Sequence, residues 1–484
     1  MRELAEAALA LVPEGVEYAD VRVVQRRHEG LHVENGRVGQ ALYEENEGIG
    51  VRVLAAGRWG FAATAHLDRE RVGRAVARAT AQARAAARLG EPVRLAPVAP
   101  VRDTYATPLE RDPFEVPVEE KLELLFEASA GMRTGGRALR TAEASVDCFR
   151  DTKVFASTEG TLLEQVITET GGGLMATAAD ADDVQRRSFP QSVPRAIRGQ
   201  RGDFATAGWE HVLSLGLVEE APRVGEEAVA LLSAAECPPT RTTLIVGGTQ
   251  MALLVHETAG HAAELDRVLG SEASLAGGSY MQPELRGRLQ FGAEIVTITA
   301  DATLRGGIGS FAYDDEGVRS QRTTIVDHGV FSGYLTSRES AGALGELSSG
   351  AARADGWQRI PLVRMSNVSL EPGETSYEEI LGTTEDGIVI DMNRSLSIDD
   401  TRSAFRFGAE IGWEVKRGKL GRMLKNCTYS GRTLEFWAAC DAVADRSSWR
   451  VYGLPSCNKG EPLQVAHVGH GTVPARFRNV RVGA

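Results

Sequence analysis

Cysteine is scarce in this chain, and the few residues of that type are far apart in the sequence. The 484 residues include five, namely Cys148, Cys237, Cys427, Cys440 and Cys457. An odd and widely spaced set argues against a disulfide-stabilised scaffold and fits a reducing compartment. We therefore predict that the protein is cytoplasmic.

Long apolar runs are also missing. No stretch approaches the roughly 18 consecutive apolar residues that a membrane-spanning helix needs, so we expect no membrane partner. The apolar start of the chain, residues 1–12, is short and is interrupted by Glu3 and Glu6. These features favour an amphipathic first helix over a signal peptide.

Positive charge is in deficit, since the formal net charge is -12 at pH 7. Nucleic-acid binding requires a basic face, so we expect no nucleic-acid partner. Arg353, Arg359 and Arg364 could form a local basic patch, but solvated or substrate-facing loop charges are the better interpretation. The hydrophobic share of 43% and the charged share of 25% are ordinary for a soluble globular protein.

The segment 256–261, which reads His-Glu-Thr-Ala-Gly-His, combines two imidazoles and a carboxylate. Two neutral imidazoles can hold a divalent metal ion, and a neighbouring Glu can accept a proton from an activated water. Metalloprotease helices usually space the two histidines four residues apart. Here His256 and His261 are five apart, which turns the second imidazole roughly 140° from the first on an ideal α-helix. A single π-helical turn would bring both to one ion, and Gly260 would make that distortion easy.

The context of the motif favours a buried helix. Residues 246–249 predict a strand end, a glycine turn and a helix cap at Thr249, and the apolar run 251–255 leads directly into His256. Two histidines and a Glu on such a helix could be ordinary hydrogen-bonded residues. Because buried polar side chains need partners, a metal ion is the competing interpretation.

The chain as a whole predicts an α+β fold. In the first half, Asn35-Gly36 and Ala56-Gly57 predict hairpin turns, residues 139–178 predict antiparallel strands, and helices are expected at 67–89, 118–132 and 209–234. The second half is rich in expected strands, at 295–299, 317–326, 330–337, 387–392, 404–416 and 432–439. The mixed order of the expected strands and helices along the chain argues against a doubly wound parallel sheet. The segment Cys237-Pro238-Pro239 marks the best domain boundary. We therefore predict two mixed sheet-and-helix domains, residues 1–236 and a β-rich domain 240–484 that carries the motif helix.

The motif and the C-terminal half resemble the TldD family of zinc metallopeptidases, also called the TldD/PmbA family. The resemblance covers most of the chain and is weaker at the N-terminus. It is carried by the segments 256–261 with Glu264 and Asp266, 314–317 (Asp-Asp-Glu-Gly), 329–335, 364–367, 370–373 and 457–460 (Cys-Asn-Lys-Gly), together with 48–53 and 60–62.

The resemblance implies a zinc peptidase in which His256, His261 and Cys457 hold Zn²⁺ and Glu257 is the catalytic base. It also implies two related sheet domains and a dimer, either a homodimer or a heterodimer with a TldE/PmbA-like paralogue that lacks the motif. Because this chain keeps the motif, it resembles the catalytic branch. We therefore expect hydrolysis of unfolded peptides or disordered protein segments. Asn458 and Glu461-Pro462 depart from the commoner family pattern and could alter the pocket beside the metal.

Several other residues have two open interpretations. Taken alone, Cys457 would be a small buried hydrophobe, and only its place in the Cys-x-Lys-Gly match favours ligation. Lys459 could lower the thiol pKa or face solvent. Glu264 could orient an imidazole or be an exposed carboxylate. His467 and His470 have the spacing of a metal pair, but structural or exposed roles are favoured.

Competing classes of function are weaker. The acidic run 314–316 lacks the spacing of a calcium loop, and a turn between strands is the better interpretation. No Gly-x-Ser-x-Gly segment is present, so a serine hydrolase of that type has no motif here. The alternative that is not an enzyme is a peptide-binding or regulatory subunit with a structural zinc. A structural zinc site needs no base, so the presence of Glu257 argues against this alternative.

Overall fold

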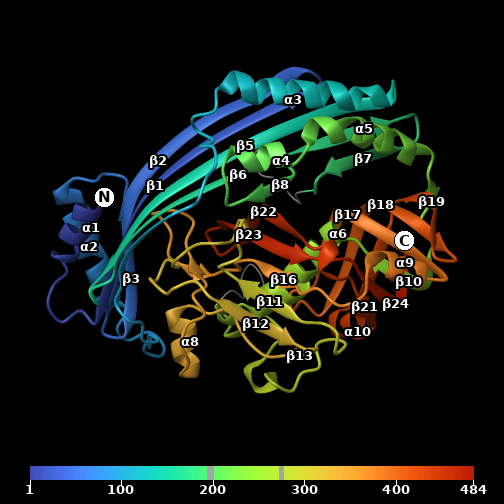
Figure 1. The fold of residues 1–484 in the computed structure, drawn as a ribbon. Coiled ribbons are helices and arrows are strands. Elements are labelled where there is room, and N and C mark those ends of the chain that lie inside the picture. The colour runs from blue at the N-terminus through green and yellow to red at the C-terminus, as the bar shows by residue number, and fades with distance from the viewer. Residues whose placement is uncertain (193–200, 272–276, 484) are drawn as a thin grey trace.

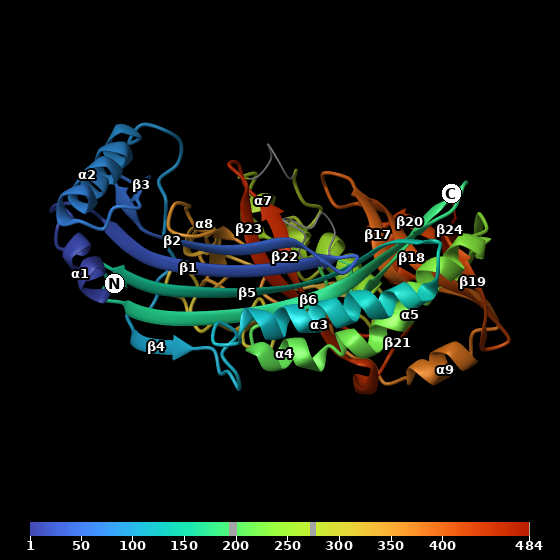
Figure 2. The same ribbon diagram turned by 90° about the horizontal axis from the view of Figure 1, so that it is seen from above.

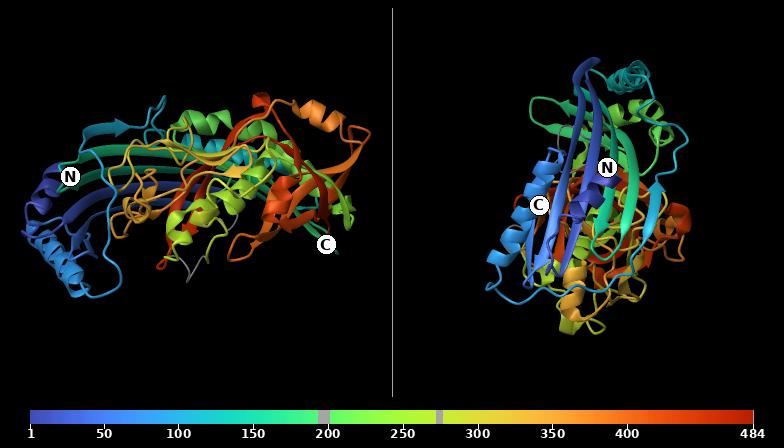
Figure 3. Two further views of the ribbon diagram at one scale, coloured as in Figure 1. Left: turned by 90° about the horizontal axis from the view of Figure 1, so that it is seen from below. Right: turned by 90° about the vertical axis from the view of Figure 1, so that its left-hand side faces the viewer.

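Strands and helices are mixed throughout the chain, and the α+β class predicted from the sequence is confirmed. The computed structural model describes residues 1–192, 201–271 and 277–483. Four long N-terminal strands arch over a compact C-terminal half, which lies beneath their concave side (Figure 1). The same arrangement is visible from above, from below and from the end that carries the first two helices (Figures 2 and 3).

The N-terminal sheet has the strand order β3-β2-β1-β5-β6-β4, and two short strands also pair with β6. Its strands are β1 (Tyr18–Glu34), β2 (Arg37–Ala55), β3 (Arg58–Thr64), β4 (Arg102–Ala106), β5 (Leu139–Ser157), β6 (Leu162–Ala179), β7 (Val184–Phe189) and β8 (Asp203–Ala205). The predicted hairpin turns are confirmed, because Asn35 and Gly36, like Ala56 and Gly57, have the positive φ angles that such two-residue turns require.

Helices cover the two ends of this sheet. They are α1 (Arg2–Leu9), α2 (Arg69–Ala85), α3 (Val118–Met132) with the short η1 (Arg133–Gly135), α4 (Trp209–Ser214) and α5 (Leu217–Ser233). The first two pack on one end of the long strands, and α3 and α5 lie side by side on the other end (Figure 2). The single helix predicted at 209–234 is divided by Gly216, whose φ of 63° breaks the helical hydrogen bonding.

The C-terminal half is built around a second sheet with the order β17-β10-β24-β20-β18-β19-β9, and β21 pairs with β24. An additional pairing between β17 and β18 closes part of it into a ring. Its strands are β9 (Ala235–Glu236), β10 (Thr240–Val246), β17 (Asp386–Ile398), β18 (Ala404–Lys416), β19 (Lys419–Lys425), β20 (Thr428–Arg432), β21 (Cys440–Val443) and β24 (Ala475–Val482). The division into 1–236 and 240–484 stays a prediction; β9, at that boundary, pairs with β19.

Smaller sheets complete this half: β13-β12-β11-β16, β14-β15 and β22-β23. Their strands are β11 (Ile298–Asp301), β12 (Arg322–Asp327), β13 (Val330–Phe331), β14 (Ala352–Arg353), β15 (Leu362–Val363), β16 (Val368–Leu370), β22 (Arg450–Lys459) and β23 (Gln464–Thr472). The helices are α6 (Gly248–Val255), η2 (His256–Gly260), η3 (His261–Ala263), α7 (Leu265–Val268), η4 (Pro283–Leu285), α8 (Arg338–Leu344), α9 (Tyr377–Gly382), α10 (Thr433–Ala438) and η5 (Arg446–Ser448).

One predicted strand is wrong. Within the strand predicted at 432–439, residues 433–438 form helix α10. Phe436 and Trp437 are buried against Phe477, with ring centroids 4.2 and 5.7 Å from it. A short apolar run can bury its side chains as either element, and here contacts with distant residues favour the helix.

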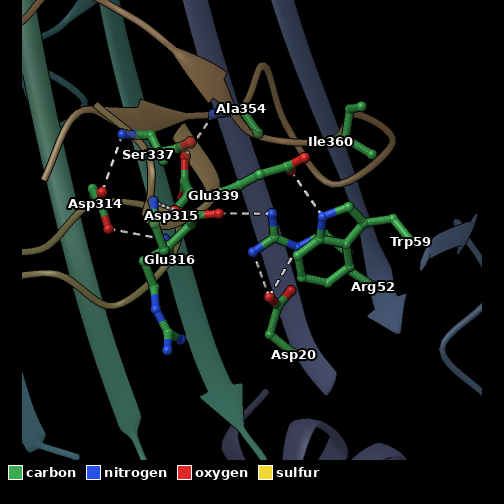
Figure 4. A network of polar contacts seen from close by, with 12 residues as sticks. Asp20, Arg52, Trp59, Asp314, Asp315, Glu316, Ser337, Glu339, Ala354 and Ile360 are labelled. Carbon is green, nitrogen blue, oxygen red and sulfur yellow. Dashed lines mark hydrogen bonds and ion pairs between the residues drawn. The ribbon is translucent and has the colours of Figure 1, made fainter. Parts of the chain in front are cut away.

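A buried ion-pair network joins the two halves (Figure 4). Arg52 of β2 lies between Asp20 of β1, at 2.6 Å, and Glu316 of the C-terminal half, at 2.8 Å. Trp59 stacks over the Arg52 guanidinium at 4.3 Å. Glu316 belongs to the acidic run 314–316 and accepts the Arg52 hydrogen bond from a turn, so the turn predicted for that run is confirmed.

Within the described ranges, no helix combines the length and the apolar character that crossing a membrane requires.

Candidate metal centre

The motif helix follows strand β10, which lies between β17 and β24 in the C-terminal sheet. Strand β10 ends at Val246, Gly247 is the N-cap, and α6 follows with every residue from Thr249 to Val255 buried. Thr249 does not cap the helix as predicted; its hydroxyl donates to Asp391 Oδ1 at 2.5 Å. The buried helix that the sequence predicted is present, and it delivers His256 to the interior.

The helix widens into a π-helical turn over His256–Gly260, as the five-residue spacing predicted. This turn brings the His256 and His261 rings within 4.8 Å of each other. Gly260 has ordinary helical angles, so the turn does not need its backbone freedom. Its importance is packing, because a Cβ at this position would lie 2.2 Å from Met365 Sδ.

Cys457 reaches the two histidines from β22. A register shift between Leu454 and Cys457 interrupts the pairing of β22 with β23, and such bulges redirect side chains. Cys457 Sγ lies 3.6 Å from His256 Nε2 and 3.7 Å from His261 Nε2. One ligand atom from each of the three buried residues lies within 4.8 Å of the others. The structure thus assembles the three residues that the resemblance assigned to a metal.

The spacing of these atoms fits a tetrahedral zinc ion. Zn–N bonds of about 2.05 Å and a Zn–S bond of about 2.3 Å, at a tetrahedral angle, place nitrogen and sulfur roughly 3.6 Å apart. Both observed N···S distances agree with that value. Three protein donors, two imidazoles and one thiolate, leave a fourth position open, which is typical of catalytic rather than structural zinc sites.

His470 sets the orientation of the first imidazole. His470 Nδ1 donates to the carbonyl of Val368 at 2.9 Å, so its Nε2 accepts from His256 Nδ1, also at 2.9 Å. This relay leaves the lone pair of His256 Nε2 directed at Cys457. Burial holds the pKa of His470 well below its usual range, which keeps the ring neutral and able to accept. Of the structural or exposed roles predicted for His470, burial excludes the exposed one, and its two hydrogen bonds show that it orients His256.

Glu264 sets the orientation of the second imidazole. His261 Nδ1 donates to Glu264 Oε2 at 3.1 Å, which leaves Nε2 free for a metal. Burial alone would raise the pKa of Glu264, but Lys459, His261 and Arg267 hold it well below its usual range. The orienting interpretation of Glu264 is confirmed, and its full burial excludes the exposed one.

Lys459 neither faces solvent nor approaches the thiol through a direct contact. It is fully buried, and its Nζ lies 2.6 Å from Asp266 Oδ1 and 3.2 Å from Glu264 Oε2. Burial alone would raise the pKa of Cys457, but the positive charges of Arg364 and His261 lower it. The thiolate form that a metal requires is therefore favoured by groups other than Lys459.

Glu257 lies at the wall of a cavity of about 480 Å³ that the three candidate ligands also line. The other lining residues come from α6, the end of β17, the loop after it, β22 and the turn after β22: Leu253, Leu396, Ser397, Ile398, Asp400, Arg402, Leu454, Ser456, Asn458 and Leu463. Arg402 Nη1 is 3.3 Å from Glu257 Oε2. Burial alone would raise the pKa of Glu257, but His256, His261 and Arg402 lower it, which keeps the carboxylate ionised.

His467 has no place in this cluster. Its Nδ1 pairs with Glu169 Oε2 of β6 at 2.5 Å, and its ring packs against Phe149. The structural role favoured for His467 by sequence is confirmed. The sequence did not predict Arg402 or the orienting role of His470. For His470 the three-residue spacing from His467 was the one signal, and for Arg402 there was none.

Comparison with protein families gives one consistent result. The PmbA/TldA metallopeptidase domain 1 matches residues 19–86, the central domain of the same family matches residues 111–235, and its C-terminal domain matches residues 239–483. The last match contains the whole candidate metal centre.

Curated relatives include a metalloprotease of Methanothermobacter thermautotrophicus that is 32% identical over 98% of this chain and 96% of its own length. A metalloprotease TldD homolog of Haemophilus influenzae is 26% identical over 97% and 93%. A zinc metalloprotease TldD homolog of Saccharolobus solfataricus is 27% identical over 47% of this chain and 48% of its own length.

Solved structures share the fold at low sequence identity. TldE of Thermococcus kodakarensis superposes with a TM-score of 0.71 at 17% identity, covering 99% of this chain and 100% of that one. A Thermotoga maritima protein described as a candidate modulator of a DNA gyrase gives a TM-score of 0.77 at 20% identity, covering 99% of both chains.

Proposed function

The chain belongs to the PmbA/TldD metallopeptidase family, and we propose that it is a zinc-dependent peptidase that hydrolyses unfolded peptides or disordered protein segments. The observation that carries this proposal is the convergence of His256, His261 and Cys457 at tetrahedral spacing beside Glu257, on the wall of one cavity. A metal held by these three donors leaves room for water and a peptide carbonyl.

The candidate ligands and the base have separate roles in the proposal. His256 and His261 would ligate through Nε2, with their tautomers held by His470 and Glu264, and Cys457 would ligate through Sγ. When bound, zinc supplies Lewis-acid polarisation of water and of the scissile carbonyl. Glu257 does not belong to the ligand cluster, so its carboxylate is free to accept a proton.

Hydrolysis then follows from the position of Glu257. The oxygen of a water bonds to the carbonyl carbon while Glu257 accepts its proton, and the carbonyl π electrons move onto oxygen. The C–N bond next breaks with its electron pair going to nitrogen, which takes the proton back from Glu257. The products are a carboxyl terminus and an amine, and the Glu257 carboxylate is regenerated.

The strands that line the cavity favour an extended peptide. Its wall includes residues 396–398 of β17 and, from β22, Leu454, Ser456, Cys457 and Asn458. Within the described residues, each segment pairs with a strand on one side only, β17 with β18 and β22 with β23. An extended chain can hydrogen-bond to the unpaired backbone groups of such strand edges without regard to its sequence. Because the candidate ligands and Glu257 are at most 8% exposed, a folded protein surface cannot reach them.

The similarity to TldE supports the proposal of a dimer, either a homodimer or a heterodimer with a TldE/PmbA-like paralogue. This chain would be the catalytic member, because it carries the full donor set and Glu257. Light scattering across a dilution series, with activity measured at each concentration, tests whether the dimer is the active form. Activity that persists in the monomer would contradict this assignment.

The proposed function is tested with one protein substrate in its folded form and in a destabilised variant. We expect cleavage of the destabilised form only, loss of cleavage after chelation, and recovery on adding Zn²⁺. A non-catalytic peptide-binding subunit with structural zinc would instead bind the destabilised form without turnover. Equal cleavage of both forms would contradict the enclosed site, and cleavage by thoroughly metal-free protein would contradict the zinc chemistry.

A further inference from the structure

The loop between β17 and β18 holds one cationic side chain over the candidate metal centre. Arg402 lies in this loop with a φ of 65°, a left-handed conformation that costs a non-glycine residue about 1 kcal/mol or more. Its backbone is held on both sides: its N–H donates to the carbonyl of Asp399 at 3.0 Å, and its own carbonyl accepts from Thr433 Oγ1 at 2.6 Å. These two contacts hold the backbone of Arg402 in place beside the cavity.

The guanidinium is mostly buried and has spare hydrogen-bond donors. The Arg402 side chain is 12% exposed and lines the cavity that contains the candidate ligands. Its contact with Glu257 is long, at 3.3 Å, and uses Nη1. Nε is buried and has no acceptor among the described residues. Since a guanidinium carries five N–H donors, several remain for a group that enters the cavity.

A peptide carbonyl that is attacked beside Glu257 becomes an anion in the same cavity. The electrons of its double bond move onto oxygen, and in a dry site that oxygen needs donors already in place. Ser456 and Asn458 also line the cavity, but both are neutral. A charged donor forms a hydrogen bond roughly twice as strong as a neutral one. Arg402 is the cation of this wall that lies within hydrogen-bond distance of the proposed base.

We propose that Arg402 is a catalytic residue that donates to the carbonyl oxygen of the scissile peptide bond as that oxygen becomes negative. This inference rests on the proposed peptidase function. It assigns the oxyanion donor, which neither the motif nor the ligand set identifies. When a peptide is bound, the Arg402 guanidinium then donates to the substrate oxygen instead of to Glu257. Glu257 is left free to accept the proton of water.

The test compares Arg402→Met with Arg406→Met. Arg406 lies on the same hairpin, in β18, and is exposed outside the cavity, so its replacement controls for the loss of a positive charge. We expect Arg402→Met to lower kcat by about 10²- to 10³-fold with KM within threefold of wild type, as for loss of an oxyanion donor. Zinc content and thermal unfolding should match wild type, and Arg406→Met should leave all four values unchanged.

Two further measurements separate a catalytic role from a structural one. Arg402→Gly tolerates the left-handed backbone and leaves space for added guanidinium ion, which should restore part of kcat where potassium ion does not. A peptide with a phosphinic group in place of the scissile amide carries a tetrahedral anion. Calorimetry should show that Arg402→Met weakens its binding by the same factor as kcat/KM, because a transition-state contact is lost from both.

Two results would overturn the inference. One is unchanged affinity for the phosphinic peptide in Arg402→Met, which would mean that Arg402 acts only through Glu257 or through the loop. The other is loss of zinc from that variant. If wild-type protein cleaves no peptide at all, the proposed function fails, while the phosphinic-peptide affinities still decide whether Arg402 contacts an anion in this cavity.

Discussion

Replacing His470 by Leu should weaken zinc binding although His470 is not a proposed ligand. His470 Nε2 accepts the hydrogen bond of His256 Nδ1 at 2.9 Å, and both rings are buried. In the variant, the Nδ1–H group of a zinc-bound His256 has no acceptor, because Nε2 must face the metal. Leaving one buried donor unpaired costs about 1–3 kcal/mol.

The cost falls mainly on the zinc-bound state, because the metal-free ring can change tautomer or turn. This free-energy cost therefore corresponds to a loss of roughly 5- to 150-fold in zinc affinity. The loss agrees with the roughly 10- to 100-fold typical of groups that orient metal-binding histidines. The assay is competition against a chromophoric chelator at fixed pH, with the fold checked by circular dichroism.

His467→Leu is the matched control, because His467 lies three residues earlier on β23 and its Nδ1 contacts Glu169 rather than the metal cluster. We expect its zinc affinity to stay within twofold of wild type. A zinc affinity of His470→Leu within twofold of wild type, or an equal loss of affinity in His467→Leu, would contradict the orienting role of His470.

The remaining predictions concern the third donor, the π-helical turn and one buried acid. Cys457→Ala should lower zinc affinity by more than about 100-fold while circular dichroism shows an intact fold, since a donor contributes more than an orienting group; undiminished tight zinc would make another residue the third ligand. Gly260→Ala should destabilise the protein by about 1–3 kcal/mol in denaturant titrations, because the added Cβ meets the buried Met365; unchanged stability would show that the turn has slack. Burial raises the pKa of Asp203 to about 7, so the stability contributed by its neutral form is present below about pH 4 and is lost as the pH rises through 7. Asp203→Asn should therefore be more stable than wild type at pH 8, by up to about 4 kcal/mol, with the difference disappearing toward pH 4 in thermal unfolding; a difference independent of pH would contradict the shift.

The features that could be predicted from the sequence are those set by nearby residues. The Asn35-Gly36 turn and helix α3 agree with expectation, because turn chemistry and apolar periodicity act over a few positions. The π-helical turn was also predictable, since the spacing of His256 and His261 leaves few ways to bring both rings to one ion.

The features that could not be predicted depend on contacts between distant segments. Cys457 lies on β22, and no rule of spacing connects it to the motif helix; only the family resemblance suggested its role. His470 reaches His256 from β23, and Arg402 reaches Glu257 from the loop after β17. Such contacts follow from how the strands stack. The three-residue spacing of His467 and His470 was a weak signal, but it did not identify His470 as the partner of His256.

Zinc-loaded Glu257→Gln protein tests the central claim most directly. In the proposed mechanism Glu257 accepts a proton, while His256, His261 and Cys457 hold the metal. We therefore predict that the variant binds one zinc per chain with wild-type affinity, still binds an unfolded peptide, and hydrolyses it about 10²- to 10⁴-fold more slowly than wild type. Near-wild-type turnover by the zinc-loaded variant would contradict the role of Glu257 as the base, and loss of zinc would contradict its separation from the ligand set.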